Sequence, residues 1–438
     1  MRIPNPLHLI QRLLCDSGLV QCDAYFSFSL TITILICAHF LGVYDILLFE
    51  SSFPSDFSWP PHVFDDASFE TYQRNADGRK IDYPEFSSSL TSSFEEWKLN
   101  AAFWRLENAN DYSDWPAFAP GMMSMVGQIP VIKTHIKYLQ AITNPVDLPP
   151  PVACTATEDA AKSLGLLIVV KSALAHFERR AAIRRTYAAA VHRRDAQRDF
   201  EVLFVLGVAG GNGVSGSGEF SWDLQERVVR EQAEFGDLVQ MRFVDTYFNN
   251  TAKTVAGIHY VVDNCPVLDP RHGFLFLTDD DMLVNVENLE KLIETVKVQR
   301  EAEGIKDVYL GYKFPGSKPK RWRLSKWYVS TNEYPFSWYP PYITAAAILL
   351  SKDTVEKFYY ASHFVPLFRF DDIYLSILAH MMAVESQHYG DAFHFDHLPF
   401  DEKTYKFYRD TVVAVHGYHD PDLLERTYDK LKKLMGRA

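Results

Sequence analysis

The chain has 438 residues, of which 47% are hydrophobic, so it can form one large or two medium domains with a buried core. Acidic residues outnumber basic ones by 56 to 44, and the formal charge of -12 argues against a nucleic-acid backbone as the main partner. A small anionic substrate fits this charge only where cations or a metal ion are placed locally.

An apolar run near the N-terminus predicts a membrane anchor. Residues 25–44 contain no residue that is charged at neutral pH, and their length is about the 20 residues that a helix needs to cross a bilayer. Two arginines precede the run and two acidic residues follow it, which favours a cytosolic N-terminus. We therefore expect a cytoplasmic tail over 1–24 and a transmembrane signal anchor over 25–49. A cleaved signal peptide and a buried core helix remain alternatives.

The region after the anchor is expected to be a stem. Residues 50–162 are rich in serine, proline and aromatic residues, and residues 163–438 form the expected catalytic domain. If the anchor is correct, only Cys154 and Cys265 of the five cysteines reach an oxidising lumen, where a disulfide between them is possible but not implied. Asn249 begins the one glycosylation sequon, N-N-T.

Short apolar runs alternate with amphipathic ones after the stem, which indicates an α/β fold. The expected strands are 164–170, 202–208, 239–244 and 274–278, and the expected helices are 178–192, 224–235 and 251–264.

A glycine-rich segment offers a rival interpretation. Residues 207–218 contain a literal G-x-G-x-x-G after a strand and before a helix, which is the context of a dinucleotide fingerprint. That fingerprint needs a tight turn, whereas about 15 small and polar residues intervene here, so a surface loop is favoured. An oxidoreductase that binds a nucleotide through this loop is kept as an alternative function.

Three consecutive carboxylates follow the last expected strand. Asp279, Asp280 and Asp281 come directly after the apolar run 274–278, and ligands of open α/β sheets gather beyond strand C-termini. Carboxylate oxygens suit Mg²⁺ or Mn²⁺, which in turn bind substrate phosphates. The triplet therefore predicts the donor half of a sugar-nucleotide transferase site. A solvated turn that favours negative charge is the alternative.

Three further segments accompany the triplet in a fixed order. They are R-R-A-A-I-R-R-T-Y at 179–187, E-Q-A-E-F-G-D-L-V-Q-M-R-F-V-D-T-Y-F-N-N-T-A-K-T at 231–254, and a discontinuous block from K-W-Y-V-S at 326–330 to F-D-D-I-Y at 370–374. Together the four blocks resemble the β-1,3-glycosyltransferases that use UDP-sugars, the galactosyltransferase family of the Golgi. The resemblance spans about residues 164–416.

The resemblance implies a fold and an activity. The family has a GT-A fold, with a Rossmann-type mixed sheet flanked by helices, and is anchored in the Golgi membrane as a single-pass type II protein. It implies Mn²⁺-dependent, inverting transfer of galactose or an N-acetylhexosamine from a UDP-sugar to the 3-hydroxyl of an acceptor glycan. The catalytic domain would be lumenal. A catalytically silent glycan-binding or chaperone-like relative is the alternative.

The resemblance also assigns the metal and donor sites. Asp281 is expected to ligate the metal directly, with His416 as a second ligand, and Asp279 to reach the ribose or act through a water. Asp280 is grouped with the nucleotide-binding residues, although strand alternation turns it away from its neighbours. Arg180, Arg184 and Lys253 are expected to bring positive charge to UDP, the alternative being a solvated basic helix face.

The remaining assignments concern the acceptor. Asp372 matches the second acid of the family's E-D-V motif and is the expected general base, which takes the proton of the attacking hydroxyl. The alternative is that Asp371 or Asp372 caps a helix. Residues expected to contact the donor or acceptor sugar are Trp327, Tyr328, Trp338, Tyr342 and Asp371.

One segment departs from the family. The residues after Tyr342 read I-T-A-A-A where the family has a cysteine and then a glycine cluster. Methyl groups in place of hydrogens narrow any close approach by a sugar. This departure motivates the silent-relative alternative.

Overall fold

The structure, a computed structural model, describes residues 139–436 except 155–164, 193–199, 210–220, 266–267, 269–272, 330–333, 335–337, 364, 366 and 397. The expected cytoplasmic tail, the expected anchor, most of the expected stem and the G-x-G-x-x-G motif lie outside these residues. Within the described part of the chain, no helix is both long enough and apolar enough to span a bilayer.

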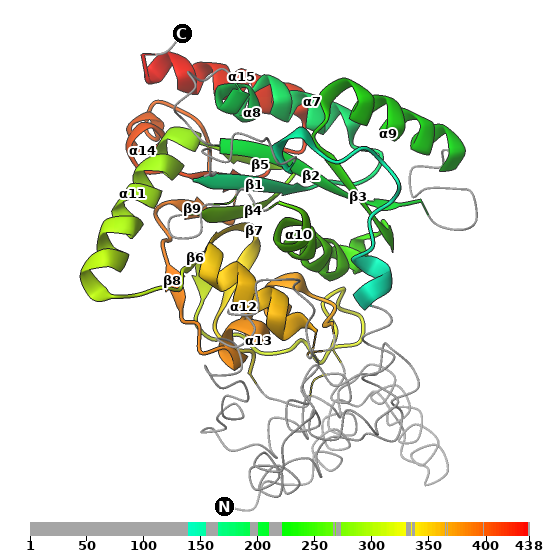
Figure 1. The fold of residues 1–438 in the computed structure, drawn as a ribbon. Helices are drawn as coiled ribbons and strands as arrows, with labels where there is room; N and C mark the ends of the chain where they lie inside the picture. The colour runs from blue at the N-terminus through cyan, green and yellow to red at the C-terminus, as the bar shows by residue number, and fades with distance from the viewer. Residues whose placement is uncertain are drawn as a thin grey trace, which may run out of the picture.

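A seven-stranded mixed sheet forms the centre of the molecule, in the order β3-β2-β1-β4-β7-β6-β8 (Figure 1). Strands β1 to β4 are parallel, β7 runs antiparallel to β4 and β6, and β8 is parallel to β6. The strands are β1 (Leu166–Lys171), β2 (Phe200–Val208), β3 (Leu238–Val244), β4 (Phe274–Asp279), β6 (Tyr309–Phe314), β7 (Tyr342–Ser351) and β8 (Ser386–His388).

Helices cover both faces of this sheet (Figure 1). One layer contains α7 (Phe177–Arg185), α8 (Tyr187–His192), α9 (Ser221–Phe235) and α15 (Pro421–Leu434). The other contains α10 (Asn250–Asn264), α12 (Lys352–Ser362) and α13 (Asp371–Met381). Two further helices, α11 (Val286–Glu303) and α14 (Tyr405–Asp410), flank the sheet.

Alternation along β1 explains the two layers. Leu166, Ile168 and Val170 belong to one hydrophobic core, while Leu167 and Val169 belong to the other. A strand buried on both faces reads as a continuous apolar run, which is why its sequence shows no polar alternation.

A second, three-stranded sheet lies beside the end of β4. It consists of β5 (Met282–Val284), β10 (Ala414–His416) and β9 (Phe393–His394), with β10 in the middle. The register of β10 places His416 opposite Met282, and the amide of Tyr418 donates to the carbonyl of Asp281 at 2.9 Å. The small sheet thus brings the C-terminal region of the chain to the acidic triplet.

The predicted elements agree with this structure, with one exception. The four expected strands correspond to β1 to β4, and 224–235 and 251–264 fall within α9 and α10. The expected helix 178–192 is two helices, because Thr186 ends α7 and its hydroxyl bonds the carbonyls of Ala182 and Ile183. The expected mixed sheet flanked by helices is confirmed.

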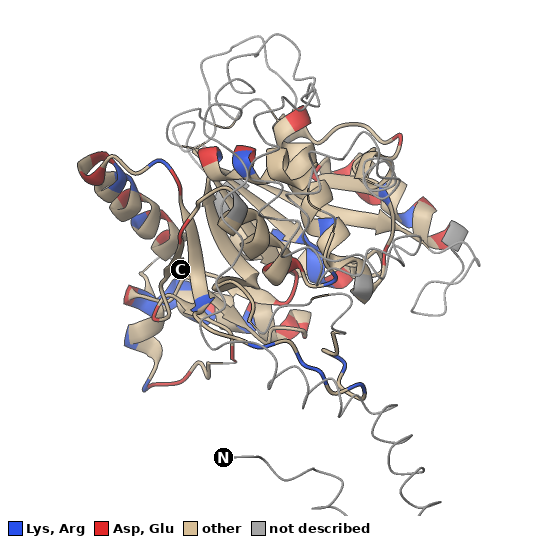
Figure 2. Cartoon of the chain, turned by 90° about the horizontal axis from the view of Figure 1, so that it is seen from below, with Lys and Arg blue, Asp and Glu red and all other residues tan. Residues whose placement is uncertain are grey.

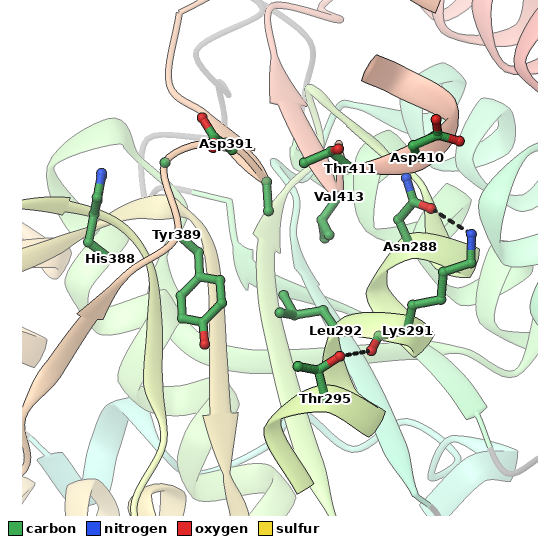
Figure 3. Close-up of a pocket in the computed structure, with 12 residues that line it drawn as sticks. Asn288, Lys291, Leu292, Thr295, His388, Tyr389, Asp391, Asp410, Thr411 and Val413 are labelled. Carbon is green, nitrogen blue, oxygen red and sulfur yellow. Dashed lines mark hydrogen bonds between the residues drawn. The ribbon is translucent and has the colours of Figure 1, made fainter. Parts of the chain in front are cut away.

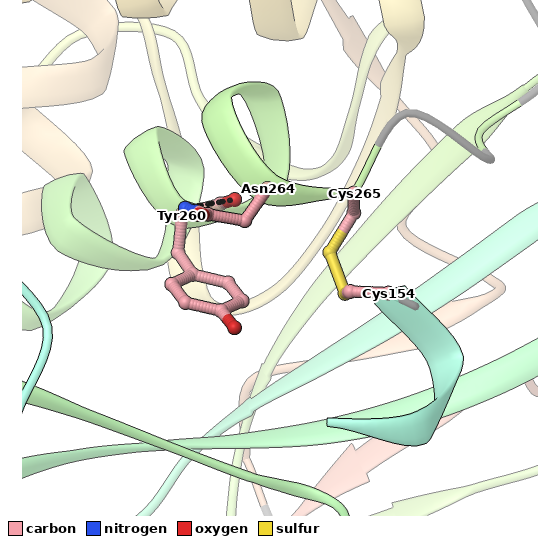
Figure 4. Close-up of a disulfide and its surroundings, with 4 residues drawn as sticks. All are labelled: Cys154, Tyr260, Asn264 and Cys265. Atoms are coloured by element: carbon pink, nitrogen blue, oxygen red, sulfur yellow. Dashed lines mark hydrogen bonds between the residues drawn. A yellow bond between two sulfur atoms is a disulfide. The ribbon is translucent and has the colours of Figure 1, made fainter. Parts of the chain in front are cut away.

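A disulfide joins Cys154 and Cys265 across a sequence separation of 111 residues (Figure 4). Cys154 ends the 3-10 helix η5 (Val152–Cys154), and Cys265 directly follows α10. The bond ties the segment before β1 to the helix layer that carries Lys253 and Thr254. A second 3-10 helix, η6 (Tyr247–Asn249), precedes α10.

Candidate active site

A buried lysine joins the two acidic motifs that the sequence singled out. Lys171 ends β1 in register with Asp279 at the end of β4. Its Nζ lies 3.0 Å from Asp279 Oδ1 and 2.6 Å from Asp371 Oδ2, and its side chain is 4% exposed. Burial would lower the pKa of Lys171, but the two carboxylates outweigh it and raise that pKa. Lys171 is therefore a fixed positive charge between the triplet and Asp371.

Sequence analysis did not assign Lys171 a role. The sequence feature that could have identified it is a lysine at the end of the apolar strand LLIVVK, at the same edge of the sheet as the acidic triplet. A lysine buried at such a position requires an acidic partner, because an isolated buried charge is strongly disfavoured. The partners come from distant parts of the chain, so the sequence alone does not identify them.

Asp371 and Asp372 begin α13, and their environments differ. Asp371 is buried and accepts hydrogen bonds from Lys171 at 2.6 Å and from Thr254 at 2.9 Å. Burial would raise the pKa of Asp371, but Lys171 outweighs it and lowers that pKa. For Asp372, burial and the charge of Asp371 raise the pKa to about 7. Two adjacent carboxyls whose pKa values are driven apart are the usual arrangement of an acid–base site.

Phe370, not either aspartate, occupies the N-cap position of α13. Asp372 does accept a hydrogen bond from the amide of Ile373 at 2.8 Å, so it contributes to the first turn of the helix. The helix N-terminus favours the ionised carboxylate. Asp372 therefore contributes to the helix N-terminus, as the capping alternative expected in part. It is also the carboxyl of the pair whose pKa lies near neutrality.

Asp281 lies in a cluster with two histidines. Asp281 Oδ2 is 3.7 Å from His416 Nε2 and 3.0 Å from His419 Nδ1, and one potential ligand atom from each residue lies within 4.8 Å of the others. The second oxygen of Asp281, Oδ1, is buried and has no hydrogen-bond partner among the described residues. A carboxylate with an unpaired buried oxygen beside two imidazoles fits a divalent cation that accepts oxygen and nitrogen ligands.

The electrostatics of this cluster are self-consistent. Burial would raise the pKa of Asp281, but its contact with His416 and the charge of that ring lower it. The same contact raises the pKa of His416. A divalent cation binds carboxylate and neutral imidazole, so metal binding at this cluster would compete with protonation of His416. His419 was not assigned as a ligand from the sequence, although it stands three residues after His416.

Asp280 lies in the turn that follows β4, and its hydrogen-bond partners differ from the two histidines beside Asp281 Oδ2. Its carboxylate binds Ser172 Oγ at 2.7 Å, His176 Nδ1 at 2.8 Å and the Arg179 guanidinium at 2.8 Å. Burial would raise the pKa of Asp280, but these three partners lower it. The contacts favour a role in holding the loop after β1 rather than in binding a nucleotide.

Arg180 and Arg184 are paired with acidic residues of the helix layer. Arg180 is fully buried and binds Glu231 through two nitrogens, at 2.9 and 2.8 Å. Arg184 binds Glu231 at 2.7 Å and Asp237 at 2.7 Å. Because both side chains are largely buried and paired, they do not form the solvated basic helix face that was the alternative. The pairs favour a structural role, and nucleotide contact by either arginine stays a prediction.

Lys253 is also held inside the fold. Its Nζ binds Asp245 Oδ1 at 2.8 Å and the carbonyl of Ser172 at 2.7 Å. Asp245 in turn accepts from the amides of Leu174 and Gly207. Lys253 therefore fixes the loop that follows Lys171, and its charge is already balanced by Asp245.

Aromatic rings lie beside the acid pair. The ring of Trp327 is 5.6 Å from that of Phe370, which directly precedes Asp371, and 6.3 Å from that of Tyr247. Trp327 and Tyr247 are both exposed. A flat, exposed aromatic surface next to a carboxyl with a pKa near neutrality is suited to a pyranose ring.

The other predicted sugar contacts differ in their exposure and in their neighbours. Tyr342 stacks on Phe314 at 5.1 Å, and burial and then the charge of Asp372 raise its pKa, which places it near the acid pair. Trp338 is exposed and has Lys318 Nζ 4.9 Å above its ring. Tyr328 is half-buried, and its backbone carbonyl accepts from Arg369 at 3.0 Å.

The alanine segment lies in β7, between β4 and β6. Ala347 pairs with Thr278, whose hydroxyl donates to the carbonyl of Ala346 at 3.0 Å. Ile343 is buried over Gly311, where an added Cβ would lie 2.5 Å from Ile343 Cγ2. The larger side chain is therefore accommodated by a glycine on the neighbouring strand, and Ala346 and Ala347 are sheet core.

Asn249 of the sequon is half-buried in η6, and its side-chain amide donates to the carbonyl of Val244 at 2.8 Å. N-glycosylation would replace one of the two hydrogens on this amide nitrogen. Glycosylation of Asn249 stays a prediction.

A pocket of about 460 Å³ lies away from these residues, between α11 and the loops before β9 and β10 (Figure 3). Its lining includes Asn288, Lys291, Tyr389, Asp391 and Asp410. It contains neither carboxyl of the acid pair and none of Asp281, His416 and His419, so this pocket is not where those side chains gather.

The chain is similar to a family of known sugar transferases. The family model described as Galactosyltransferase matches residues 178–390. A β-1,3-galactosyltransferase of Drosophila melanogaster is 35% identical over 267 residues, which cover 61% of this chain and 74% of that protein. A β-1,3-galactosyltransferase of Caenorhabditis elegans is 31% identical over 61% of this chain and 74% of that protein. A lactosylceramide 1,3-N-acetyl-β-D-glucosaminyltransferase of Xenopus laevis is 32% identical over 51% of this chain and 56% of that protein.

Proposed function

The chain belongs to the galactosyltransferase family and is a β-1,3-hexosyltransferase, and on that premise we propose that Asp372 is the base of an inverting transfer from a UDP-sugar. The transferred sugar is galactose or an N-acetylhexosamine, and the acceptor is the 3-hydroxyl of a glycan. The observation that carries the assignment is the pair of adjacent carboxyls, of which Asp371 is ionised and Asp372 has a pKa of about 7.

The pair gives each carboxyl a separate task. Asp371 is held ionised by Lys171 and keeps the neighbouring carboxyl from ionising at low pH. Asp372 accepts the proton of the acceptor hydroxyl while that oxygen forms a bond to the anomeric carbon. The bond between this carbon and the phosphate oxygen breaks, and its electron pair leaves with UDP. A base whose pKa is near the working pH is both ionised and strong enough for this step.

We further propose that Asp281, His416 and His419 hold Mn²⁺ in a GT-A-like domain. The unpaired buried oxygen of Asp281 and the two adjacent imidazoles support this ligand set. When bound, the cation would offset the charge on the departing diphosphate. Lys171 acts as a positioning residue, since it fixes Asp279 on the donor side and Asp371 on the acceptor side through one side chain.

The location we propose is the Golgi membrane, with residues 25–49 as the anchor and the catalytic domain in the lumen. The Cys154–Cys265 disulfide supports an oxidising compartment. The apolar run in the sequence supports the anchor. Protease protection of intact vesicles tests the orientation: the catalytic domain should resist added protease until detergent is present.

The experiment for the function uses the full chain with a panel of UDP-sugars and glycan acceptors in the presence of Mn²⁺. Asp372→Asn should lower kcat on the order of 10²- to 10⁴-fold with little change in the binding of UDP. Asp391→Asn, at an exposed aspartate remote from the acid pair, is the matched control and should keep wild-type activity. Product formation by Asp372→Asn at the wild-type rate would show that another group is the base.

A further inference from the structure

One segment of the chain, which includes β6 and the loop after it, is positively charged, whereas the chain as a whole is negatively charged. From Val308 to Asn332 the chain has no acidic residue and six basic ones, although the whole chain has a formal charge of -12. Figure 2 shows acidic and basic positions interspersed over most of the molecule, with blue positions following one another along an exposed loop. The six basic residues are Lys313, Lys318, Lys320, Arg321, Arg323 and Lys326.

The centre of this loop is a preformed turn, which we name the basic tip and define as residues 320–328. An isolated bridge pairs Lys320 with Tyr328, and the amide of Val329 donates to the carbonyl of Lys320 at 2.9 Å. Arg321 is buried beneath the turn, where its guanidinium donates to the carbonyls of Val329 at 2.9 Å and Tyr334 at 2.7 Å. The tip is thus fastened to the body by a buried arginine, while most of its other side chains are exposed.

The outward side chains alternate between apolar and cationic. Trp322 is 40% exposed and Leu324 is 71% exposed, and the basic residues Lys320, Arg323 and Lys326 around them are exposed as well. Large apolar side chains facing water carry a free-energy penalty that a pure electrostatic site for a soluble anion would not require. At a bilayer surface the same residues fit: indole rings lie at the level of the headgroups, and cations reach the phosphates.

We propose that the basic tip docks on the surface of a lipid bilayer that contains anionic lipid. Its base adjoins the active site, because Trp327 packs 5.6 Å from Phe370 and Arg369 binds the carbonyl of Tyr328 at 3.0 Å. Docking would therefore bring Asp371 and Asp372 close to the membrane surface. The acidic body is repelled by such a surface, so electrostatics favour the orientation in which the tip faces it.

Hydrogen–deuterium exchange of the full chain tests the proposal without any sugar transfer, so its outcome is separate from that of the proposed function. The chain is reconstituted in lipid nanodiscs of phosphatidylcholine with phosphatidylserine, in nanodiscs of phosphatidylcholine alone, and in detergent. We expect the amides of residues 320–328 to exchange roughly tenfold more slowly in the anionic bilayer than in detergent, with a smaller effect in phosphatidylcholine.

A double variant and a matched control separate docking from a general effect of reconstitution. Trp322→Ser with Leu324→Ser should remove the protection of the tip while leaving exchange in β4 and activity on a soluble acceptor unchanged. Val298→Ser on α11 changes a side chain of similar exposure, 67%, and should change nothing. Equal exchange of the tip in all three environments would overturn the proposal.

Two further experiments test whether the basic tip binds a different partner. Heparin is added to the chain in detergent, and the protein concentration in detergent is varied. Protection of the tip by heparin without protection by the anionic bilayer would assign it to an acidic glycan. Protection that depends on protein concentration would assign it to a second copy of the chain. Either result would also overturn membrane docking.

Discussion

At the residue scale, the account depends on Lys171 more than on any other single side chain. Its ammonium group lies between Asp279 and Asp371, and among the described ion pairs it is the one cation that contacts both acidic motifs. Without it, the buried carboxylate of Asp371 would lie close to that of the partly exposed Asp279 with no countercharge between them. Removing one partner of a buried ion pair costs about 3–5 kcal/mol in stability.

Lys171→Met should therefore lower stability by about 3–5 kcal/mol and abolish activity. Thermal unfolding and initial rates with a UDP-sugar measure the two effects. The double variant Lys171→Met with Asp371→Asn removes one of the unpaired carboxylates and should recover part of the stability but not the activity. A single variant that unfolds like the wild type would contradict the proposed ion-pair network.

The pKa of about 7 for Asp372 predicts an acid limb in the pH–rate profile. The base must be ionised, so kcat should fall as the pH drops below about 7 and level off above it. Replacement of Asp371 by Asn removes the neighbouring charge and should shift this limb to lower pH. A wild-type profile that is flat from pH 5 to 8 would contradict the raised pKa of Asp372, since a carboxyl with its ordinary pKa would stay ionised over roughly that range.

The same shift has a consequence for stability. Asp372 has a raised pKa in the folded state, so between its ordinary value of 3.8 and about 7 the folded chain binds a proton that the unfolded chain does not. The contribution of this group to stability therefore falls as the pH rises through that window. Asp372→Asn should be more stable than the wild type at pH 8, and equal melting temperatures there would contradict the burial of this carboxyl.

At the element scale, the sheet was predictable and the partners of the charged residues were not. Apolar runs identified β1 to β4 because strands buried on both faces leave an uninterrupted signal. The basic residues Arg180, Arg184 and Lys253 were expected near phosphate because the sequence shows their charge but not Glu231, Asp237 and Asp245, which bind them from other elements.

The small sheet brings a histidine to Asp281 that the sequence did not assign. His416 was assigned from the resemblance, and β10 places it beside Asp281. His419 joins the cluster because the chain turns after β10, and the amide of Tyr418 bonds back to Asp281. A histidine three residues beyond a strand carries no signal for such a turn in a single sequence.

If the cluster binds metal, each histidine should contribute to affinity. His416→Ala and His419→Ala should each raise the Mn²⁺ concentration needed for half-maximal activity by on the order of tenfold or more, with a common kcat at saturating metal. His394→Ala, at a histidine outside the cluster, is the control. Equal Mn²⁺ dependence in all variants would place the metal elsewhere.

The disulfide between η5 and α10 should contribute to stability rather than to chemistry. Cys154→Ser with Cys265→Ser should lower the free energy of unfolding by about 2–5 kcal/mol, because the bond closes a long loop of the unfolded chain. Activity measured well below the melting temperature should be retained. A melting temperature that does not respond to the double substitution or to reducing agent would contradict this role.

At the scale of the whole molecule, the metal cluster, Lys171 and the acid pair form one continuous arrangement at the ends of β1 and β4. The residues that we propose for the donor and acceptor sides come from segments that are far apart in the chain and meet only in the fold. The pocket beside α11 contains none of these residues. The basic tip extends from the acceptor side, so membrane docking and transfer would share one face.

The most direct measurement is a crystal structure of the chain with UDP, Mn²⁺ and an acceptor glycan. We predict an anomalous manganese peak bounded by Asp281, His416 and His419, with the acceptor 3-hydroxyl within hydrogen-bond distance of the Asp372 carboxylate. A manganese ion remote from Asp281, or an acceptor hydroxyl that contacts a group other than Asp372, would contradict the account.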